Sequence, residues 1–349
     1  MKLKVLIVDD SAIMRKILVK IIQTASDMVL MGEASDPFEA RDKLAVEIPD
    51  VMILDIEMPK MDGLTFLDKV MGHKPIPILI FSGHAKTGSQ VTLKALELGA
   101  VDILEKPQDL TKGFDQIRDA ILGKIRMAAK SKVKSPATIA PKTASPHPVL
   151  SSQDYDPSRY LAVASSTGGT EALKVFFAGF NGWIPPTVVV QHMPKGFTKT
   201  FSEHLNKMFP FEVKEAENGD KLQPNRVLIA PGDFHMEVVK VGLQFQIRLH
   251  QEPQIHGVRP AADYLMKSVA QSIGSKAVGV VLTGMGKDGA QGLLQMKQVG
   301  SFCIAQSEQT CVVFGMPSAA IAAGAIDKVL DLNEISSFVL SKMKKKAAA

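Results

Sequence analysis

The 349-residue sequence has only two cysteines, Cys303 and Cys311. So low a content argues against a disulfide framework or a cysteine-ligated metal site, and we expect both thiols to be reduced residues of the core. No apolar run approaches the roughly 18 residues that a membrane-spanning helix requires. A strand-like apolar run begins almost at the N-terminus and leaves no space for a signal peptide. We therefore expect a cytoplasmic protein without direct membrane insertion.

Acidic residues are missing between Asp119 and Asp154, although this stretch carries six basic residues. They are Lys124, Arg126, Lys130, Lys132, Lys134 and Lys142. Because these six charges exceed the net charge of +5, the basic excess marks one segment and argues against a nucleic-acid-binding surface. Its proline, serine and lysine content is typical of a mobile linker, which could also contact an acidic partner or an acidic face of the protein itself.

The length of the chain exceeds that of a usual single core, so two domains are expected. Hydrophobic residues make up 46% and charged residues 22% of the sequence, as in an ordinary soluble protein. No internal repeat has the period of a solenoid. We therefore predict a first domain at residues 1–122, a flexible basic linker at residues 123–157 and a second domain at residues 158–345.

The first domain alternates short apolar runs with helical patterns. The runs are short, aliphatic or β-branched and bounded by polar residues, as in buried parallel strands, and they stand at residues 5–8, 51–54, 78–81 and 101–104. Apolar residues recur at helical spacing over residues 13–21. The sequence Asp-Pro-Phe-Glu at residues 36–39 predicts a helix start with a capping box. A further helix is expected over residues 89–98, ending at Gly99.

Polar side chains follow the ends of these runs. Asp9 and Asp10 follow the first run, and Asp55 follows the second. Ser82 and Lys106 follow later ones. In an open α/β sheet, ligands bind beyond the carboxyl ends of the strands, so these side chains should meet. Clustered carboxylates favour a hard cation such as Mg²⁺ among them, and the lysine could pair with a phosphoryl oxygen. The alternative is that the aspartates merely cap helices.

The motifs VLIVDDS, ILDIEMPKMDG and LEKP resemble the receiver domain of bacterial two-component response regulators over roughly residues 3–122. The resemblance implies a flavodoxin-like fold with a five-stranded parallel sheet and helices on both faces. It implies that Asp55 accepts a phosphoryl group from a histidine kinase, and that Asp9 and Asp10 bind Mg²⁺ together with it. Ser82 and Lys106 would be the switch residues that sense the phosphoryl group and pair with it.

The second domain also begins as an α/β unit. Strand-like runs stand at residues 160–164, 187–191, 226–230 and 278–282. Two further runs at residues 236–239 and 244–249, with Gly242 between them, predict an added β-hairpin. We therefore expect a doubly wound α/β domain that carries a hairpin.

Three of these runs are followed by the parts of a nucleophilic site. Ser165 and Ser166 follow the first run, and His192 follows the second. Asp288 follows the fourth, in the loop TGMGKDG. A serine hydroxyl needs an imidazole to take its proton, and a carboxylate fixes the imidazole tautomer. Serine, histidine and aspartate at three strand ends of one sheet therefore predict a hydrolytic triad.

The fingerprints of several other sites are absent. The loop SSTGGT could bind phosphate, but it has neither the GxGxxG spacing nor a GKS or GKT ending. The GxSxG elbow of many hydrolases is also missing, because Ala164 stands two residues before Ser166. From the residues alone, His192 could be a structural histidine, and Asp288 could cap a helix beside a tight turn.

Across both domains the chain resembles the bacterial chemotaxis protein-glutamate methylesterase family. The motifs STGGT, VVQHMP, RVLIAPGDFH, HGVRPAAD and LTGMGKDGA occur in the expected order. The resemblance implies Ser166 as the nucleophile, His192 as the base and Asp288 as the orienting acid. It also implies that the backbone amide of Met285 stabilises the oxyanion. The usual loop of the family has glycine and alanine before the nucleophile, and this chain has Ala164 and Ser165 there. The nucleophile is therefore assigned by its place directly before Thr-Gly-Gly.

The resemblance implies a phosphorylation-regulated carboxylic ester hydrolase of chemotaxis. It would demethylate methyl-esterified glutamates on chemoreceptors and deamidate specific glutamines there. Its partners would be methylated chemoreceptors and a histidine kinase, with Mg²⁺ in the receiver and no cofactor in the esterase. We expect the receiver to gate the esterase. One alternative is an esterase of small esters, and another is a non-catalytic output domain. A DNA-binding output would need a helix-turn-helix with clustered basic residues, and the second domain does not have that pattern.

Overall fold

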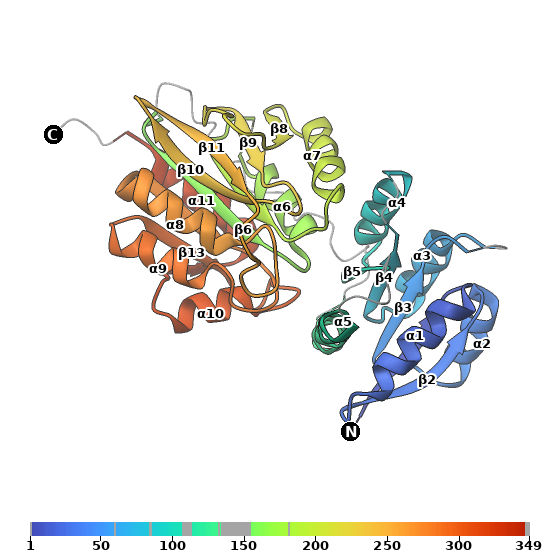
Figure 1. Ribbon diagram of the computed structural model, residues 1–349. Helices are drawn as coiled ribbons and strands as arrows, with labels where there is room; N and C mark the ends of the chain where they lie inside the picture. The colour runs from blue at the N-terminus through green and yellow to red at the C-terminus, as the bar shows by residue number, and fades with distance from the viewer. Residues whose placement is uncertain are drawn as a thin grey trace. The chain divides into compact units, whose positions relative to one another are not determined.

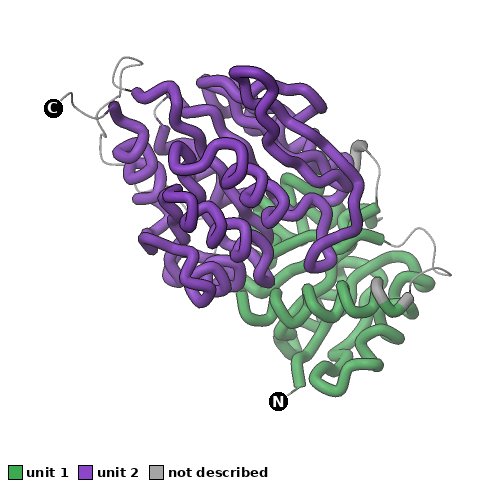
Figure 2. The backbone as a smooth tube through the Cα atoms, turned by 60° about the vertical axis from the view of Figure 1, so that its left-hand side comes forward, with its two compact units in different colours: residues 1–140 green, residues 141–349 purple. Residues whose placement is uncertain are grey.

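The computed structural model describes residues 2–58, 61–83, 86–106, 114–131, 133, 155–180 and 182–345. The chain forms two compact units, residues 1–140 and residues 141–349 (Figure 2). Both units are built on mostly parallel sheets with helices between most successive strands, so the expected α/β fold class is confirmed. The two units are described separately below.

Unit 1 contains a five-stranded parallel sheet in the order β2-β1-β3-β4-β5 (Figure 1). Its strands are β1 (Leu3–Val8), β2 (Met28–Ala34), β3 (Val51–Asp55), β4 (Ile78–Ser82) and β5 (Asp102–Glu105). Its helices are α1 (Ala12–Gln23), α2 (Pro37–Val46), α3 (Gly63–His73), α4 (Lys86–Glu97) and α5 (Phe114–Ala129). The strand order reverses between β1 and β3, and right-handed crossovers therefore place helices on both faces of the sheet.

The predicted start of α2 is present with one difference. The side chain of Asp36 accepts hydrogen bonds from the backbone N–H groups of Phe38 and Glu39, both at 3.0 Å, and proline occupies the first helical position. Glu39 Oε2 accepts from the N–H of Ser35 at 2.8 Å, and not from that of Asp36 as a strict capping box requires. The aspartate cap is confirmed, and the reciprocal bond is shifted by one residue.

The last helix of unit 1 enters the predicted linker. Helix α5 continues to Ala129, so residues 123–129 of the expected linker 123–157 are helical. The reason is burial, because Ile125 and Ala128 are fully buried despite the basic residues around them. Tyr155, near the other end of that segment, is buried as well. Residues 134–154 lie outside the described residues, and the domain boundaries otherwise stay a prediction.

Unit 2 is built on a seven-stranded sheet in the order β14-β13-β12-β6-β7-β9-β8, and a separate two-stranded hairpin joins β10 to β11 (Figure 1). The strands are β6 (Tyr160–Ser165), β7 (Thr187–Gln191), β8 (Glu212–Glu215), β9 (Arg226–Ile229), β10 (His235–Val241), β11 (Gln244–His250), β12 (Ala277–Val281), β13 (Phe302–Gln306) and β14 (Lys328–Leu330). The helices are α6 (Gly169–Ala178), α7 (Phe197–Met208), α8 (Ala262–Ser272), α9 (Ala290–Gln298), α10 (Met316–Ala322) and α11 (Leu332–Met343), with a short 3₁₀ turn, η2 (Gly274–Lys276).

The core of unit 2 lies around its central strands. Every residue of β7 and of β12 is buried, as expected for parallel strands covered on both faces. Helix α8 packs against α9 and against β10 of the hairpin. The inward residues Met236, Val238 and Ile247 of the hairpin join the same core as α8. The predicted hairpin is confirmed, and its packing supports the start of α8.

Cys303 and Cys311 are both free and buried, as expected from the sequence. Burial raises the pKa of the Cys303 thiol to about 12. Among the helices of the described residues, none is long and apolar enough to cross a membrane.

Candidate functional site

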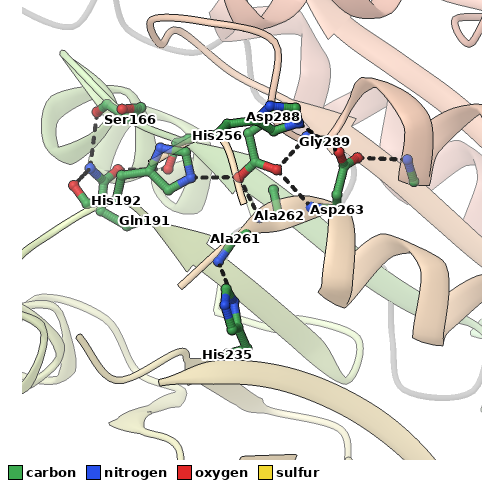
Figure 3. Close-up of polar contacts among 12 residues, drawn as sticks. Ser166, Gln191, His192, His235, His256, Ala261, Ala262, Asp263, Asp288 and Gly289 are labelled. Atoms are coloured by element: carbon green, nitrogen blue, oxygen red, sulfur yellow. Dashed lines mark hydrogen bonds and ion pairs between the residues drawn. The ribbon is translucent and has the colours of Figure 1, made fainter. Parts of the chain in front are cut away.

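Three neighbouring strands of unit 2 bring the predicted triad together at the carboxyl edge of the sheet. Strand β6 lies between β12 and β7, with Ala164 paired to residues of both. Ser166 follows β6, His192 follows β7, and Asp288 lies between β12 and α9. Figure 3 shows the side chains of His192 and Asp288 pointing toward each other beside Ser166. The sheet order therefore accounts for a site whose members lie far apart in sequence.

The imidazole of His192 forms a hydrogen bond with the carboxylate of Asp288. His192 Nε2 lies 2.8 Å from Asp288 Oδ2, and the aspartate is 1% exposed. With the carboxylate ionised, Nε2 carries the proton that it donates, so Nδ1 is the ring nitrogen left to accept a proton from a nucleophile. This contact disfavours the alternative of an unrelated structural histidine.

The carboxylate of Asp288 is held by backbone amides as well as by the imidazole (Figure 3). Ala262 N donates to Oδ2 at 2.6 Å, Asp263 N donates to Oδ1 at 3.0 Å, and Gly289 N donates to Oδ1 at 2.9 Å. Burial alone would raise the pKa of Asp288, but the bond to His192, its charge and the amides outweigh burial and lower that pKa. Asp288 thus stays ionised.

The alternative that Asp288 caps a helix is correct for α8 but not for the helix that follows it in sequence. Helix α9, which follows it in sequence, starts after Gly289 and has no side-chain cap. The helix that Asp288 does cap is α8, since it accepts from the first two N–H groups of that helix, and residue 261 at its start offers no capping side chain. The same contacts that cap α8 also fix the carboxylate against His192.

The two adjacent serines have different surroundings. Ser165 is fully buried and donates its hydroxyl to Gln191 Oε1 at 2.7 Å. Ser166 is only partly buried, and its N–H donates to Thr283 O at 3.0 Å. No hydrogen bond joins its Oγ to His192 in the part of the chain that the structure describes, which is common before substrate binds. The partial exposure of Ser166, against the complete burial of Ser165, favours Ser166 as the nucleophile.

The loop that carries Met285 lies against Ser166. A Cβ atom at Gly284 would stand 2.8 Å from Ser166 Cβ, so only glycine permits this approach. The N–H of Met285 makes no hydrogen bond to any described residue, and the residue is 41% exposed. A backbone donor without a partner, in a loop that lies against Ser166, is compatible with the predicted role of Met285 in stabilising an oxyanion.

Several groups of the site were not assigned from the sequence. They are the amides of Ala262 and Asp263, which hold Asp288, and the side chain of Gln191. The motif HGVRPAAD was a signal for the first two, but only the fold shows that this segment starts a helix at the triad. His256, Asp263 and Asp288 place ligand-type atoms within 4.8 Å of one another, yet the carboxylates already accept amide or imidazole donors.

Unit 1 brings together the second predicted group. Atoms of Asp9, Asp10 and Asp55 lie within 4.8 Å of one another, at the carboxyl ends of β1 and β3. Lys106 Nζ lies 2.7 Å from Asp55 Oδ2 and 3.1 Å from Asp9 Oδ2. Asp9 does not cap α1, because Ser11 is the cap, and Asp9 Oδ1 accepts the N–H of that serine instead. The expected juxtaposition therefore exists, although Pro107 of the LEKP motif lies outside the described residues.

The electrostatics of this group suit a cation. Burial raises the pKa of Asp55 to about 6, against the opposing effect of Lys106. Burial lowers the pKa of Lys106, but its bonds to Asp55 and Asp9 outweigh burial and raise it. Asp9 Oδ2 is buried and has no well-oriented hydrogen bond among the described residues, despite its ion pair. Hard oxygen donors with such an unsatisfied atom fit Mg²⁺.

The backbone carbonyl of Ser82, at the end of β4, accepts the N–H of Lys106 at 2.9 Å, but among the described residues its hydroxyl makes no hydrogen bond to the side chains of this group. Its hydroxyl accepts from Thr92 Oγ1 at 3.1 Å, and β4 pairs Phe81, not Ser82, with Asp55. Ser82 is buried at the same edge of the sheet. Its predicted role as a sensor of the phosphoryl group stays a prediction.

Comparisons with known proteins match both units of the chain. The family model described as CheB methylesterase matches residues 161–339, and that of the response regulator receiver domain matches residues 5–118. The crystal structure of the Thermotoga maritima CheB methylesterase catalytic domain aligns with a TM-score of 0.51 and 40% identity. The alignment covers 52% of this chain and 97% of that one.

Two relatives match along their whole length and share the name protein-glutamate methylesterase/protein-glutamine glutaminase. The protein of Bdellovibrio bacteriovorus is 54% identical, with 100% of this chain and 99% of that protein covered. The protein of Salmonella typhimurium is 45% identical, with 98% and 97% covered. This chain therefore belongs to the CheB methylesterase family, with a receiver domain ahead of its methylesterase domain.

Proposed function

We propose that this protein is a phosphorylation-regulated protein-glutamate methylesterase and protein-glutamine glutaminase that acts on chemoreceptors. The observation that carries the proposal is the His192–Asp288 pair at the strand end next to Ser166. Full-length relatives bear the same name. The substrate is a receptor glutamate that carries a methyl ester, and the products are methanol and a free glutamate.

Ser166 Oγ attacks the ester carbonyl while His192 Nδ1 takes the hydroxyl proton. Asp288, through its bond to Nε2, stabilises the imidazolium that forms. The carbonyl oxygen becomes an oxyanion, which accepts the N–H of Met285. The intermediate collapses with loss of methanol, which receives the proton from the imidazolium, and leaves an acyl ester on Ser166.

Water completes the cycle by the same groups. His192 takes a proton from water, the resulting hydroxide attacks the acyl carbonyl, and Ser166 leaves with the proton returned by the imidazolium. A glutamine side chain follows the same route with ammonia as the first leaving group. Both reactions end in a glutamate carboxylate, so one triad suffices for both activities in the name of the relatives.

The receiver supplies the regulation. Asp55 accepts the phosphoryl group from a histidine kinase, and Lys106 pairs with the incoming oxygens, as its place 2.7 Å from Asp55 allows. Asp9, Asp10 and Asp55 would hold Mg²⁺, which would neutralise charge on the phosphoryl oxygens during transfer. The new negative charge then changes the state of the receiver and releases the hydrolase.

The test measures methanol release from membranes with methylated chemoreceptors and, separately, from small methyl esters. We expect turnover of the receptor substrate that far exceeds that of the small esters, and loss of both in the Ser166→Ala variant. A protein that hydrolyses only small esters would be the alternative esterase. A protein that binds receptors without releasing methanol or ammonia would be a non-catalytic output domain, and the proposal would be wrong.

A further inference from the structure

Gln191 is the last residue of β7 and is 3% exposed. It lies beside Ser166 and His192 (Figure 3). Its Nε2 donates to Ser166 O at 2.9 Å and to His192 O at 3.2 Å. Its Oε1 accepts from Ser165 Oγ at 2.7 Å. If the amide were flipped, Oε1 would face the carbonyl oxygens of Ser166 and His192. The three hydrogen-bond partners therefore fix the orientation of the amide. One buried amide thus ties the nucleophile residue to the base residue.

The position of Gln191 coincides with the end of the sheet ladder. Ser165 pairs with Gln191 as the last register pair of β6 and β7, and His192 N donates to Ser165 O at 3.1 Å. Beyond this point, the described residues show no backbone hydrogen bond between the two segments. The side chain of Gln191 is therefore the link that continues the connection to Ser166 and His192 themselves.

The surroundings of the amide are shaped to admit it. A Cβ atom at Gly169 would stand 2.1 Å from Gln191 Oε1 and 2.8 Å from Ser165 Cβ, so the first residue of α6 must be glycine. The N–H of Gly169 donates to Ser166 O at 2.7 Å, alongside the amide of Gln191. Ser165 adds a hydroxyl that holds Oε1 away from the carbonyl groups.

We propose that Gln191 is a positioning residue that sets Ser166 against His192, with the hydroxyl of Ser165 locking the amide in its donating orientation. Gln191 does not touch the substrate. Its two donated bonds fix the backbone of both residues, on which the approach of Ser166 Oγ to His192 Nδ1 depends. This inference goes beyond the proposed function and rests on its assignment of Ser166 as the nucleophile.

The test compares Gln191→Glu with Gln191→Leu in the full-length protein. Ionised glutamate can accept from Ser165 but cannot donate to the carbonyl groups, so we expect kcat to fall about 100-fold at pH 8 with KM changed less than about twofold. Burial against carbonyl oxygens raises the pKa of such a carboxyl, and the neutral form can donate again. Activity relative to the unsubstituted protein should therefore recover as the pH falls in Gln191→Glu, and should stay low in Gln191→Leu.

Ser165→Ala is the second variant. It should lower kcat only a few-fold, roughly the effect of one lost neutral hydrogen bond, and should add nothing in the Gln191→Leu background. If Gln191→Glu does not fold, the kcat and KM of Gln191→Leu decide. A kcat within about twofold of the unsubstituted protein, or equal losses in kcat at all pH values in both Gln191 variants, would overturn the proposal.

A second readout separates this proposal from the function on which it rests. A fluorophosphonate should label Ser166, located by peptide mass spectrometry, and the labelling rate should fall in Gln191→Leu in parallel with kcat. An unchanged labelling rate overturns the positioning role. Labelling at a residue other than Ser166 overturns the nucleophile assignment instead.

Discussion

The hydroxyl groups of Ser165 and Ser166 differ in what they can reach. Ser165 is buried and bonded to Gln191, whereas Ser166 is partly exposed beside the loop of Gly284. Ser166→Ala should therefore reduce methanol release by several orders of magnitude without loss of the fold, while Ser165→Ala should lower it only a few-fold. Rates on methylated receptors and thermal unfolding curves of both variants check this. An inactive Ser165→Ala with an active Ser166→Ala would reverse the assignment.

Asp288 is hydrogen-bonded both to His192 and to the first N–H groups of α8. Its replacement should therefore lower both the catalytic rate and the unfolding free energy of unit 2. Asp288→Asn should lower kcat by about 10⁴-fold, because the amide cannot hold the required imidazole tautomer. The pKa of Asp288 is lowered in the folded protein, so its carboxylate stabilises the fold above the unfolded pKa of about 3.9, and this contribution is lost as the pH falls through the folded pKa.

Urea unfolding of unit 2 between pH 2.5 and 5 measures that linkage. The difference in unfolding free energy between the unsubstituted protein and Asp288→Asn should be constant near pH 5 and should shrink toward the acid end. Glu203, an exposed acid on α7 of the same unit, provides the matched control as Glu203→Gln, whose difference should stay small. A difference that grows with falling pH would contradict the charge state assigned to Asp288.

At the scale of elements, burial decides where α5 ends. Ile125 is fully buried on that helix, whereas Ile13 on α1 is 66% exposed. Ile125→Ala should cost about 2–5 kcal/mol of the unfolding free energy of unit 1, and Ile13→Ala should cost less than about 1 kcal/mol. Chemical denaturation followed by a probe in unit 1 compares them. Equal effects would mean that residues 123–129 act as linker after all.

The elements that the sequence predicted share a strong local signal. Aliphatic runs such as residues 51–54 and 187–191 lie in central strands and are confirmed. Strand β8 (Glu212–Glu215) was missed because it is short and mostly charged. Strand β14 (Lys328–Leu330) was missed because it has only three residues. β2, an edge strand, was missed as well. β13 was also missed, although it is an interior strand with four buried residues, so burial does not account for it. Sequence patterns report burial on two faces, and edge strands have little of it.

The site was predictable where motifs stand at strand ends, and unpredictable where the backbone acts. Ser166, His192 and Asp288 could be read as side-chain types after apolar runs. The amides of Ala262 and Asp263 have no signature in their side chains, and Gln191 reads as one more strand residue. These groups serve the site through contacts between segments that only the sheet order brings together.

At the scale of the whole molecule, phosphorylation of Asp55 should control the activity of the esterase site. The proposed mechanism uses no metal ion at that site. A small phosphodonor with Mg²⁺ should raise esterase activity in the unsubstituted protein and not in Asp55→Asn, whose amide cannot form an acyl phosphate. Chelation of Mg²⁺ should prevent the rise and leave basal activity unchanged. Receptor demethylation rates check all three, and a fall in basal activity on chelation would place a metal in the catalytic half.

Removal of residues 1–150 should give a fragment with higher activity than the unphosphorylated full-length protein. The strands from Tyr160 onward form a complete sheet within unit 2, and all triad residues lie beyond the cut. Demethylation rates of fragment and full-length protein at equal concentration test this. A folded fragment no more active than the resting protein would contradict gating, and would indicate that the receiver recruits the enzyme to its substrate.

The order of strands β12, β6 and β7 also determines when the triad can assemble during synthesis of the chain. Ser166 and His192 directly follow β6 and β7, which are made early in unit 2, whereas the loop of Asp288 follows β12, on the other side of β6. Domains generally fold as units while the ribosome still synthesises the rest of the chain. The receiver can fold during synthesis of the hydrolase, but no triad exists until β12 has emerged and paired with β6. Every newly made molecule therefore possesses its regulator before it has an activity to regulate.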